Sequence, residues 1–179
     1  RPRDGNFVYS GEEADKMLRE IAFCGGIGVN GVVLGALTPE GKIDLPLCRE
    51  LISVARSYGL EITFHRAIDE ALTKALSLVP CSKIPQSPEE LSPAVLEAIK
   101  GVMEDVFDLG VERILSSGGA PTAYKGRVVL GAMGRFAEES RGPIIMAGGG
   151  VTPQNAPLIL DATGLCELHG SRLSLLSLQ

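Results

Sequence analysis

The sequence predicts an α/β fold with a parallel sheet, arranged as in a TIM (β/α)8 barrel and not as a doubly wound sheet. Short apolar or β-branched runs alternate with amphipathic helical patterns along the chain. Each run ends in a polar or glycine-rich segment, as expected where all the loops face one site. The most glycine-rich segment follows the penultimate run, whereas a Rossmann fingerprint would follow the first strand.

Five strands are expected at the spacing of successive βα units, which makes the sheet parallel. In chain order they are Gly31–Gly35, Leu60–Phe64, Arg113–Ser116, Pro143–Ala147 and Leu165–His169. Helical periodicity predicts the segments that precede and connect these strands. They are Gly11–Phe23, Asp44–Tyr58 with Asp44 as N-cap, a helix from Pro88 or Pro93 to Leu109, Tyr124–Glu139 and Pro153–Asp161.

One wide gap, from Ala71 to Pro93, interrupts the spacing and contains four prolines and scattered serines. This composition is typical of a loop, so we interpret residues 71–93 as a Pro-rich insertion and not as a domain boundary. A chain of 179 residues is long enough for one domain with a substantial core. We therefore expect residues 1–179 to form a single domain.

The formal net charge of −5 and a pI near 5.1 argue against a nucleic-acid partner, which would need a basic face. No apolar run reaches the length of a membrane span and no signal peptide is visible, so we expect no membrane partner and a cytoplasmic location.

The cysteines are widely spaced and form no CxxC pair; they are Cys24, Cys48, Cys81 and Cys166. With only two histidines in the chain, a dedicated zinc cluster is not expected. Buried or half-buried free thiols are the expected state, which fits a reducing cytosol.

The segment Thr63–Asp69 is the strongest indication of a site, because an apolar strand ends there in His65 and Arg66. Ionisable groups at the end of a buried strand incur a desolvation cost that packing does not require. We expect His65 to transfer protons and Arg66 to balance substrate charge. Asp69 has three open interpretations: it orients a neighbouring cation, acts as a second acid–base group or caps the following helix.

The last two expected strands are followed by further candidates. Gly148 and Gly149 begin a glycine-rich loop that either binds an anion or forms a tight turn. His169 either transfers protons or is only a hydrogen-bonded structural group, and Ser171 would donate to an anion.

Four more residues complete the candidate set. Ser117 follows the third expected strand and is either an anion ligand or part of a serine-glycine turn. Thr38, after the first expected strand, offers a hydroxyl to a ligand. Arg1 and Arg3 either clamp a carboxylate or phosphate or are solvated terminal charges.

Several of these segments resemble the CutC family, the copper homeostasis proteins. "RPRDGNFVYS" resembles the motif that follows the third barrel strand of that family, and five later segments resemble its fourth to eighth units in order. These are "GVVLGALTPEGKID", "TFHRAID", "VERILSSGG", "IIMAGGGVT" and "ELHGS". The resemblance covers nearly the whole chain apart from residues 71–93, although "HGSR" stands where many members have "HGSA" or "HCSA".

The resemblance implies a TIM barrel that is incomplete here, because the first two strands and most of the third are missing. The cysteines proposed to bind copper(I) in the family lie in those first two strands. None of the four cysteines of this chain stands at such a position, so no metal ligand is carried over to it. Copper(I) is thus implied by the resemblance alone and not supported by the residues present.

Three functions remain open. The first is copper homeostasis through a cytosolic copper(I)-binding barrel, as the resemblance implies. The second is a TIM-barrel enzyme that acts on a small anionic or phosphorylated metabolite, with a reaction that the residues do not define. The third is a truncated, non-catalytic remnant. Because an incomplete barrel has open sheet edges, we expect poor solubility or edge pairing with another chain, including a homo-oligomer.

Overall fold

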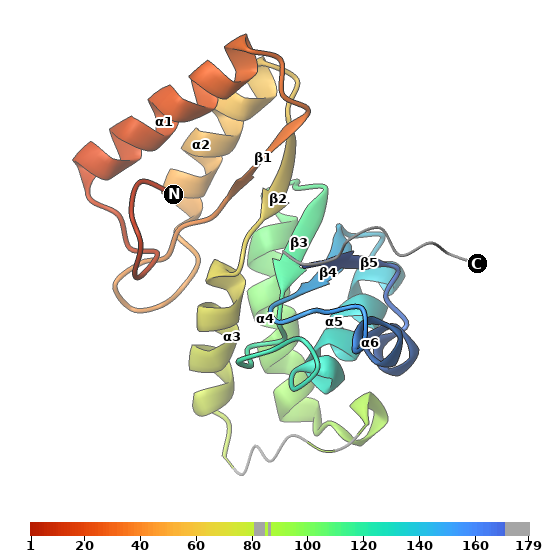
Figure 1. Cartoon of the computed structure of the whole chain (residues 1–179). Helices are drawn as coiled ribbons and strands as arrows, with labels where there is room; N and C mark the ends of the chain where they lie inside the picture. The colour runs from red at the N-terminus through yellow and green to blue at the C-terminus, as the bar shows by residue number, and fades with distance from the viewer. Residues whose placement is uncertain (81–84, 86, 171–179) are drawn as a thin grey trace.

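The computed structural model describes residues 1–80, 85 and 87–170 of the chain. Its centre is a five-stranded sheet in which every neighbouring pair of strands is parallel (Figure 1). The strands are β1 (Gly31–Leu34), β2 (Glu61–Phe64), β3 (Arg113–Ser116), β4 (Ile144–Gly148) and β5 (Glu167–His169). All five lie where the sequence predicts them and differ only at their ends.

The described helices are α1 (Gly11–Gly26), α2 (Leu45–Ser57), α3 (Ala67–Ser77), the 3-10 turn η1 (Pro88–Glu90), α4 (Pro93–Phe107), α5 (Arg127–Glu139) and α6 (Ala156–Thr163). Three of them, α1, α2 and α4, begin at residues whose side chains cap them: Ser10, Asp44 and Ser92. The predicted N-cap at Asp44 is confirmed, since its carboxylate accepts from the N–H of Leu47 at 3.1 Å. α5 begins three residues later than predicted, at Arg127. None of the helices in the described residues is long and apolar enough to cross a membrane.

The prediction of an irregular loop from Ala71 onwards is wrong for its first part, because α3 extends to Ser77. Ala71 and Leu72 face the core and are almost fully buried, as the apolar spacing within α3 requires. The prolines on which the prediction rested all follow Val79. Residues 81–84 and 86 of the predicted loop lie outside the described residues.

The order of strands in the sheet is the order in the chain, β1-β2-β3-β4-β5. Because crossovers between parallel strands are right-handed, a sheet that grows in one direction receives its helices on one face. In Figure 1, α4 and α5 lie behind β3 and β4, and α2 packs on β1 and β2. A doubly wound sheet would instead reverse direction at a switch point and carry helices on both faces.

One face of the sheet is covered by helices. Residues paired in register form a row across four strands on this face: Leu34, Phe64, Ile114 and Ile145. Each side chain of this row is at most 3% exposed. Burial of such a row removes several large apolar side chains from water, each contributing about 1.5–3 kcal/mol to folding.

The opposite face is open. Its corresponding row is Val33, Thr63, Arg113 and Ile144. Val33 is 57% exposed and Ile144 is 42% exposed, which is unusual for aliphatic residues in a parallel sheet. No helix or loop among the described residues covers these two side chains.

A charged bridge also crosses the open face. Nη1 of Arg113 lies 2.7 Å from Oε2 of Glu61, and Nε of Arg113 lies 3.0 Å from Oε2 of Glu167. Arg113 thus links β2 to β5 across β4, and the two carboxylates raise its pKa. The bridge lies towards the amino ends of the strands, since Glu61, Arg113 and Glu167 are each the first residue of their strand.

Candidate functional site

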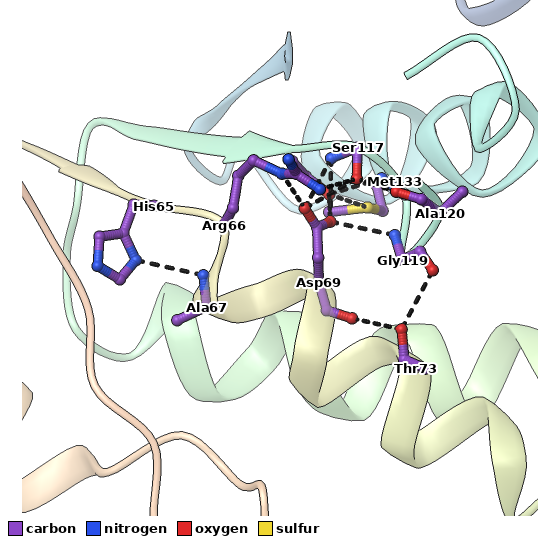
Figure 2. A network of polar contacts seen from close by, with 11 residues as sticks. His65, Arg66, Ala67, Asp69, Thr73, Ser117, Gly119, Ala120 and Met133 are labelled. Carbon is purple, nitrogen blue, oxygen red and sulfur yellow. Dashed lines mark hydrogen bonds and ion pairs between the residues drawn. The ribbon is translucent and has the colours of Figure 1, made fainter. Parts of the chain in front are cut away.

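A polar cluster joins the segments that follow β2 and β3 (Figure 2), and the loop after β4 lies against it at Gly149. Arg66 follows β2, Ser117 follows β3 and Gly149 follows β4. Parallel strands place their carboxyl ends at one edge of the sheet, so residues far apart in the chain meet there. The sequence predicted all three as site residues, and the structure brings them together.

Asp69 is the centre of the cluster. Its Oδ1 accepts from Oγ of Ser116 at 2.7 Å and from the N–H groups of Ser117 and Gly119 at 2.9 and 3.0 Å. Its Oδ2 accepts from Nε of Arg66 at 2.7 Å. The side chain is 8% exposed, so both oxygens are buried and already have donors. Asp69 therefore holds the guanidinium group of Arg66 in place, and its role in a functional site stays a prediction.

The alternative of Asp69 as an N-cap is wrong. Arg66 occupies the cap position of α3, and Asp69 stands in the first helical turn with its carboxylate directed towards the β3 loop. A carboxylate in the first turn still interacts favourably with the positive end of the helix dipole.

Arg66 is held along one edge of its guanidinium group. Nε donates to Asp69 and Nη2 donates to Oγ of Ser117 at 2.8 Å. These two nitrogens form one lateral edge of the guanidinium group. The terminal edge consists of Nη1 and the second N–H of Nη2, and no acceptor is described for it. The Arg66 side chain as a whole is 40% exposed.

Two glycines of the β4 loop have different structural roles. A Cβ on Gly149, which has φ +103°, would lie 3.3 Å from Nη1 of Arg66, so glycine leaves room for the guanidinium group. A Cβ on Gly148 would lie 2.4 Å from Cδ1 of Leu115, so glycine there permits close packing on β3. Only Gly149 thus adjoins the polar cluster through Arg66.

His65 lies apart from this cluster, although it precedes Arg66 directly. Figure 2 shows its ring on the side of the chain away from Asp69, with Nδ1 accepting from the N–H of Ala67 at 3.2 Å. That bond places the ring proton on Nε2, which is buried and has no partner among the described residues. Burial is the main cause that lowers the pKa of His65 to about 4. At neutral pH the ring is therefore a neutral hydrogen-bond donor.

Aromatic packing fixes the His65 ring. The ring of Phe7 lies 4.6 Å from it, centroid to centroid, and the guanidinium group of Arg1 lies 4.6 Å from the centroid of the Phe7 ring. A Cβ on Gly35 would lie 2.8 Å from Nδ1 of His65, so a glycine is needed beneath the imidazole.

An open cleft of about 710 Å³ runs from the polar cluster along α3. Its volume is within the range of small-molecule sites. The cationic side chains in its lining belong to Arg1, Arg66 and Lys74, and the acidic ones to Asp69 and Glu70. The sequence pointed to Arg1, Arg66 and Asp69, but it missed Lys74 because residues 71–93 were interpreted as a loop.

Arg3 has a different place from Arg1. Its five N–H donors are used within the N-terminal segment, by Glu13, Asn6 and the carbonyl groups of Asp4, Asn6 and Val8. The same Glu13 forms a capping box with Ser10 at the start of α1. Arg3 therefore holds this loop against α1 and has no donor left for a ligand.

The remaining candidates lie outside the polar cluster. His169 is exposed at the end of β5, where its Cα pairs with that of Gly148. Thr38 lies in a tight loop, with its N–H bonded to the carbonyl of Lys42, and does not line the cleft. Ser171 lies outside the described residues. Sequence analysis missed Ser116, whose position as the last residue of β3 was the available signal.

The three cysteines that the structure describes, Cys24, Cys48 and Cys166, do not form a shared metal site. Cys24 is half-buried, Cys48 is buried, and Cys166 is exposed, contrary to the expected burial. Burial raises the pKa of the Cys48 thiol to about 12, which disfavours the thiolate that copper(I) binds. In the part of the chain that the structure describes, no group of three or more His, Cys, Asp or Glu side chains could hold a metal ion. Cys81 lies outside those residues.

The fold and the polar strand ends define a singly wound α/β protein with a site at the carboxyl edge of its sheet. The family model for the CutC family matches residues 1–81 and 94–174. The chain belongs to the CutC family. Residues 82–93, within the predicted insertion, are left unmatched.

Individual relatives agree with this assignment. A "family protein CutC" from Vibrio parahaemolyticus is 39% identical over 170 residues, covering 94% of this chain and 58% of the relative. A protein of the same name from Xanthomonas campestris is 37% identical over 171 residues, covering 96% of this chain and 59% of the relative. The chain thus spans less than two thirds of the length of these curated relatives.

A solved structure is also similar. The crystal structure of a candidate copper homeostasis protein CutC from Streptococcus agalactiae matches with a TM-score of 0.74 and 28% sequence identity. The match covers 97% of this chain and 71% of that chain.

Proposed function

We propose that this chain is part of a TIM barrel that serves copper homeostasis in the cytoplasm. Its sequential parallel strands and its single helix-covered face support this proposal, because consecutive barrel units have that arrangement. The observation that carries the proposal is the open face, where Val33 and Ile144 are exposed as residues of a barrel interior would be without the remaining strands.

In this proposal copper(I) is bound outside the described residues. The three described cysteines differ in burial and belong to no group of side chains that could hold a metal ion. Burial raises the pKa of the Cys48 thiol, which keeps that thiol protonated. The ligands would then come from the cysteine-containing strands that the family resemblance places before Arg1.

A competition titration with a chromogenic copper(I) chelator tests this assignment. We expect the 179-residue chain to bind no copper(I) tightly, and a version extended by the two upstream strands to bind it stoichiometrically. Serine variants of Cys24, Cys48 and Cys166 serve as controls and should not change either result. Tight, stoichiometric binding by the chain alone, lost in one of these variants, would refute the assignment.

A second candidate function, an enzyme acting on a small anionic metabolite, is favoured by the geometry of Arg66. Two hydrogen bonds hold its guanidinium group, its terminal edge has no described acceptor, and the residue lines the cleft. A pre-oriented guanidinium edge matches the geometry of a carboxylate or phosphate. In this function Arg66 and Arg1 would balance ligand charge, and Asp69 would orient Arg66.

Thermal shift in the presence of inorganic phosphate, phosphonates and carboxylates tests the second function. We expect an anion to raise the melting temperature of the chain, and we expect Arg66→Gln to abolish that shift. Arg3→Gln is the matched comparison, because Arg3 has no free donor; it should lower the melting temperature itself but leave the anion-induced shift. Equal anion-induced shifts with and without Arg66 would refute the second function.

A further inference from the structure

The cleft contains two separate cationic positions on one helix. Arg66 stands at the start of α3, and Lys74 lies eight residues further along it. A rise of about 1.5 Å per residue places the two positions about 12 Å apart along the helix axis. Both side chains line the same cleft, and Lys74 is exposed.

The three cationic side chains of the cleft lining outnumber its two acidic ones, and of these cations only Arg66 has a described salt bridge. Asp69 is saturated by protein donors and engages only one edge of Arg66. No ion pair with an acidic side chain is described for Lys74 or for Arg1. Glu70 is the one exposed carboxylate of the described lining, and it lies between the two cations in the sequence of α3.

The size of the cleft also matters. A volume of about 710 Å³ is far larger than a single phosphate or carboxylate group requires. A ligand that fills it must extend along α3. Its middle would pass Glu70, which accepts hydrogen bonds and therefore suits hydroxyl or amine groups.

We infer that the cleft binds an elongated polar metabolite with an anionic group at each end, one on the free edge of Arg66 and the other on Lys74. This inference rests on the second candidate function and specifies its ligand class. Arg66 provides the oriented, bidentate contact, because its guanidinium plane is fixed by Asp69 and Ser117. Lys74 provides a point charge on a flexible stem, so it selects for ligand length and not for geometry.

Isothermal titration of the 179-residue chain with synthetic probes tests the inference. The probes are octane-1,8-diphosphonate, butane-1,4-diphosphonate and methylphosphonate. We expect the eight-carbon probe to bind about threefold or more tightly than the four-carbon probe, since one exposed cation contributes modestly. Lys74→Gln should remove this length preference and leave methylphosphonate binding unchanged. Arg49→Gln, an exposed cation on α2 outside the cleft, should leave all three affinities unchanged.

The outcomes separate the inference from the function on which it rests. The inference alone would be refuted if methylphosphonate binding depended on Arg66 but the two diphosphonates bound equally well. It would also be refuted if the preference for the longer diphosphonate survived Lys74→Gln. Absence of binding by all three probes to the folded chain would refute both. Circular dichroism of each variant establishes that it is folded, and the exposed position of Lys74 makes loss of folding unexpected.

Discussion

The carboxylate of Asp69 accepts the backbone N–H of Ser117 at 2.9 and 3.1 Å, one distance for each oxygen. This contact joins the start of α3 to the end of β3. It lies beside the pairing of β2 with β3, which has only two residue pairs, whereas β1 and β2 share four. The buried carboxylate thus supports the sheet at its shortest ladder and orients Arg66 at the same time.

Replacing Asp69 should therefore destabilise the protein strongly. Asp69→Asn removes the charge and gives the buried side chain an N–H2 group that faces donors. We expect the free energy of unfolding to fall by about 3 kcal/mol, the cost typical of a broken buried charge network. Because the chain has no tryptophan, urea unfolding followed by circular dichroism is the suitable measurement. The exposed neighbour Glu70→Gln should change stability by less than about 0.5 kcal/mol; similar losses in both variants would contradict this role.

Gly149→Ala should affect both stability and the Arg66 site. Alanine is strained at φ +103°, and its Cβ would contact Nη1 of Arg66 at 3.3 Å. We expect a loss of roughly 1–3 kcal/mol and weaker phosphonate binding. Gly28→Ala provides the control, since Gly28 also has a positive φ, of +78°, but open space around it. The Gly28 variant should lose stability without weaker phosphonate binding, and equal binding losses in the two variants would contradict the prediction.

Acid should destabilise the protein through His65. Its pKa is about 4 in the folded chain, below the ordinary value of 6.5, mainly because of burial. Between these values the unfolded chain binds a proton that the folded chain excludes, so stability falls as the pH falls from 6.5 towards 4. The full contribution is up to about 3 kcal/mol.

This pH dependence can be assigned to one residue. His65→Phe should make the free energy of unfolding nearly independent of pH between about pH 6.5 and 5. This interval lies above the range in which most carboxylates titrate. His169→Gln, at the exposed histidine, should leave the slope of the wild type. Histidine proton shifts in NMR spectra provide a second measurement, because the chain has only two histidines. A His65 resonance that titrates near pH 6.5 in the folded chain would contradict the prediction.

The open sheet face should make this chain self-associate. Val33 is 57% exposed and Ile144 is 42% exposed on that face, and β1 and β5 are edge strands. We expect sedimentation velocity to show association that increases with concentration and is reduced by Val33→Lys. Leu158→Lys is the matched control, since Leu158 is 53% exposed on α6 and away from the sheet. A chain that stays monomeric at all concentrations would contradict the proposed incomplete barrel.

Local sequence patterns were sufficient for most of the fold. The five strands and the Asp44 cap were predicted because apolar alternation and capping act over a few residues. α3 was partly missed, since a cluster of prolines downstream outweighed its own apolar spacing. That error concealed Lys74 and with it one end of the cleft.

The candidate site was only partly predictable. His65 and Arg66 are adjacent in the sequence and were expected to act together, but they point to different sides of the chain. Asp69 could not be distinguished from a helix cap until the β3 loop was placed beside it. Arg3 resembled a free anion ligand, although local carbonyl groups and Glu13 use all its donors.

The sequence by itself determined the order of the strands and the polar residues at their ends, because both depend on neighbouring residues in the chain. Only the tertiary structure decided which of those polar groups remain available to a ligand. Nε of Arg66 donates to a carboxylate that α3 supplies, whereas the terminal edge of the same guanidinium group has no described acceptor. That partition depends on register and helix orientation, which bring Asp69, Ser117 and Gly149 around Arg66.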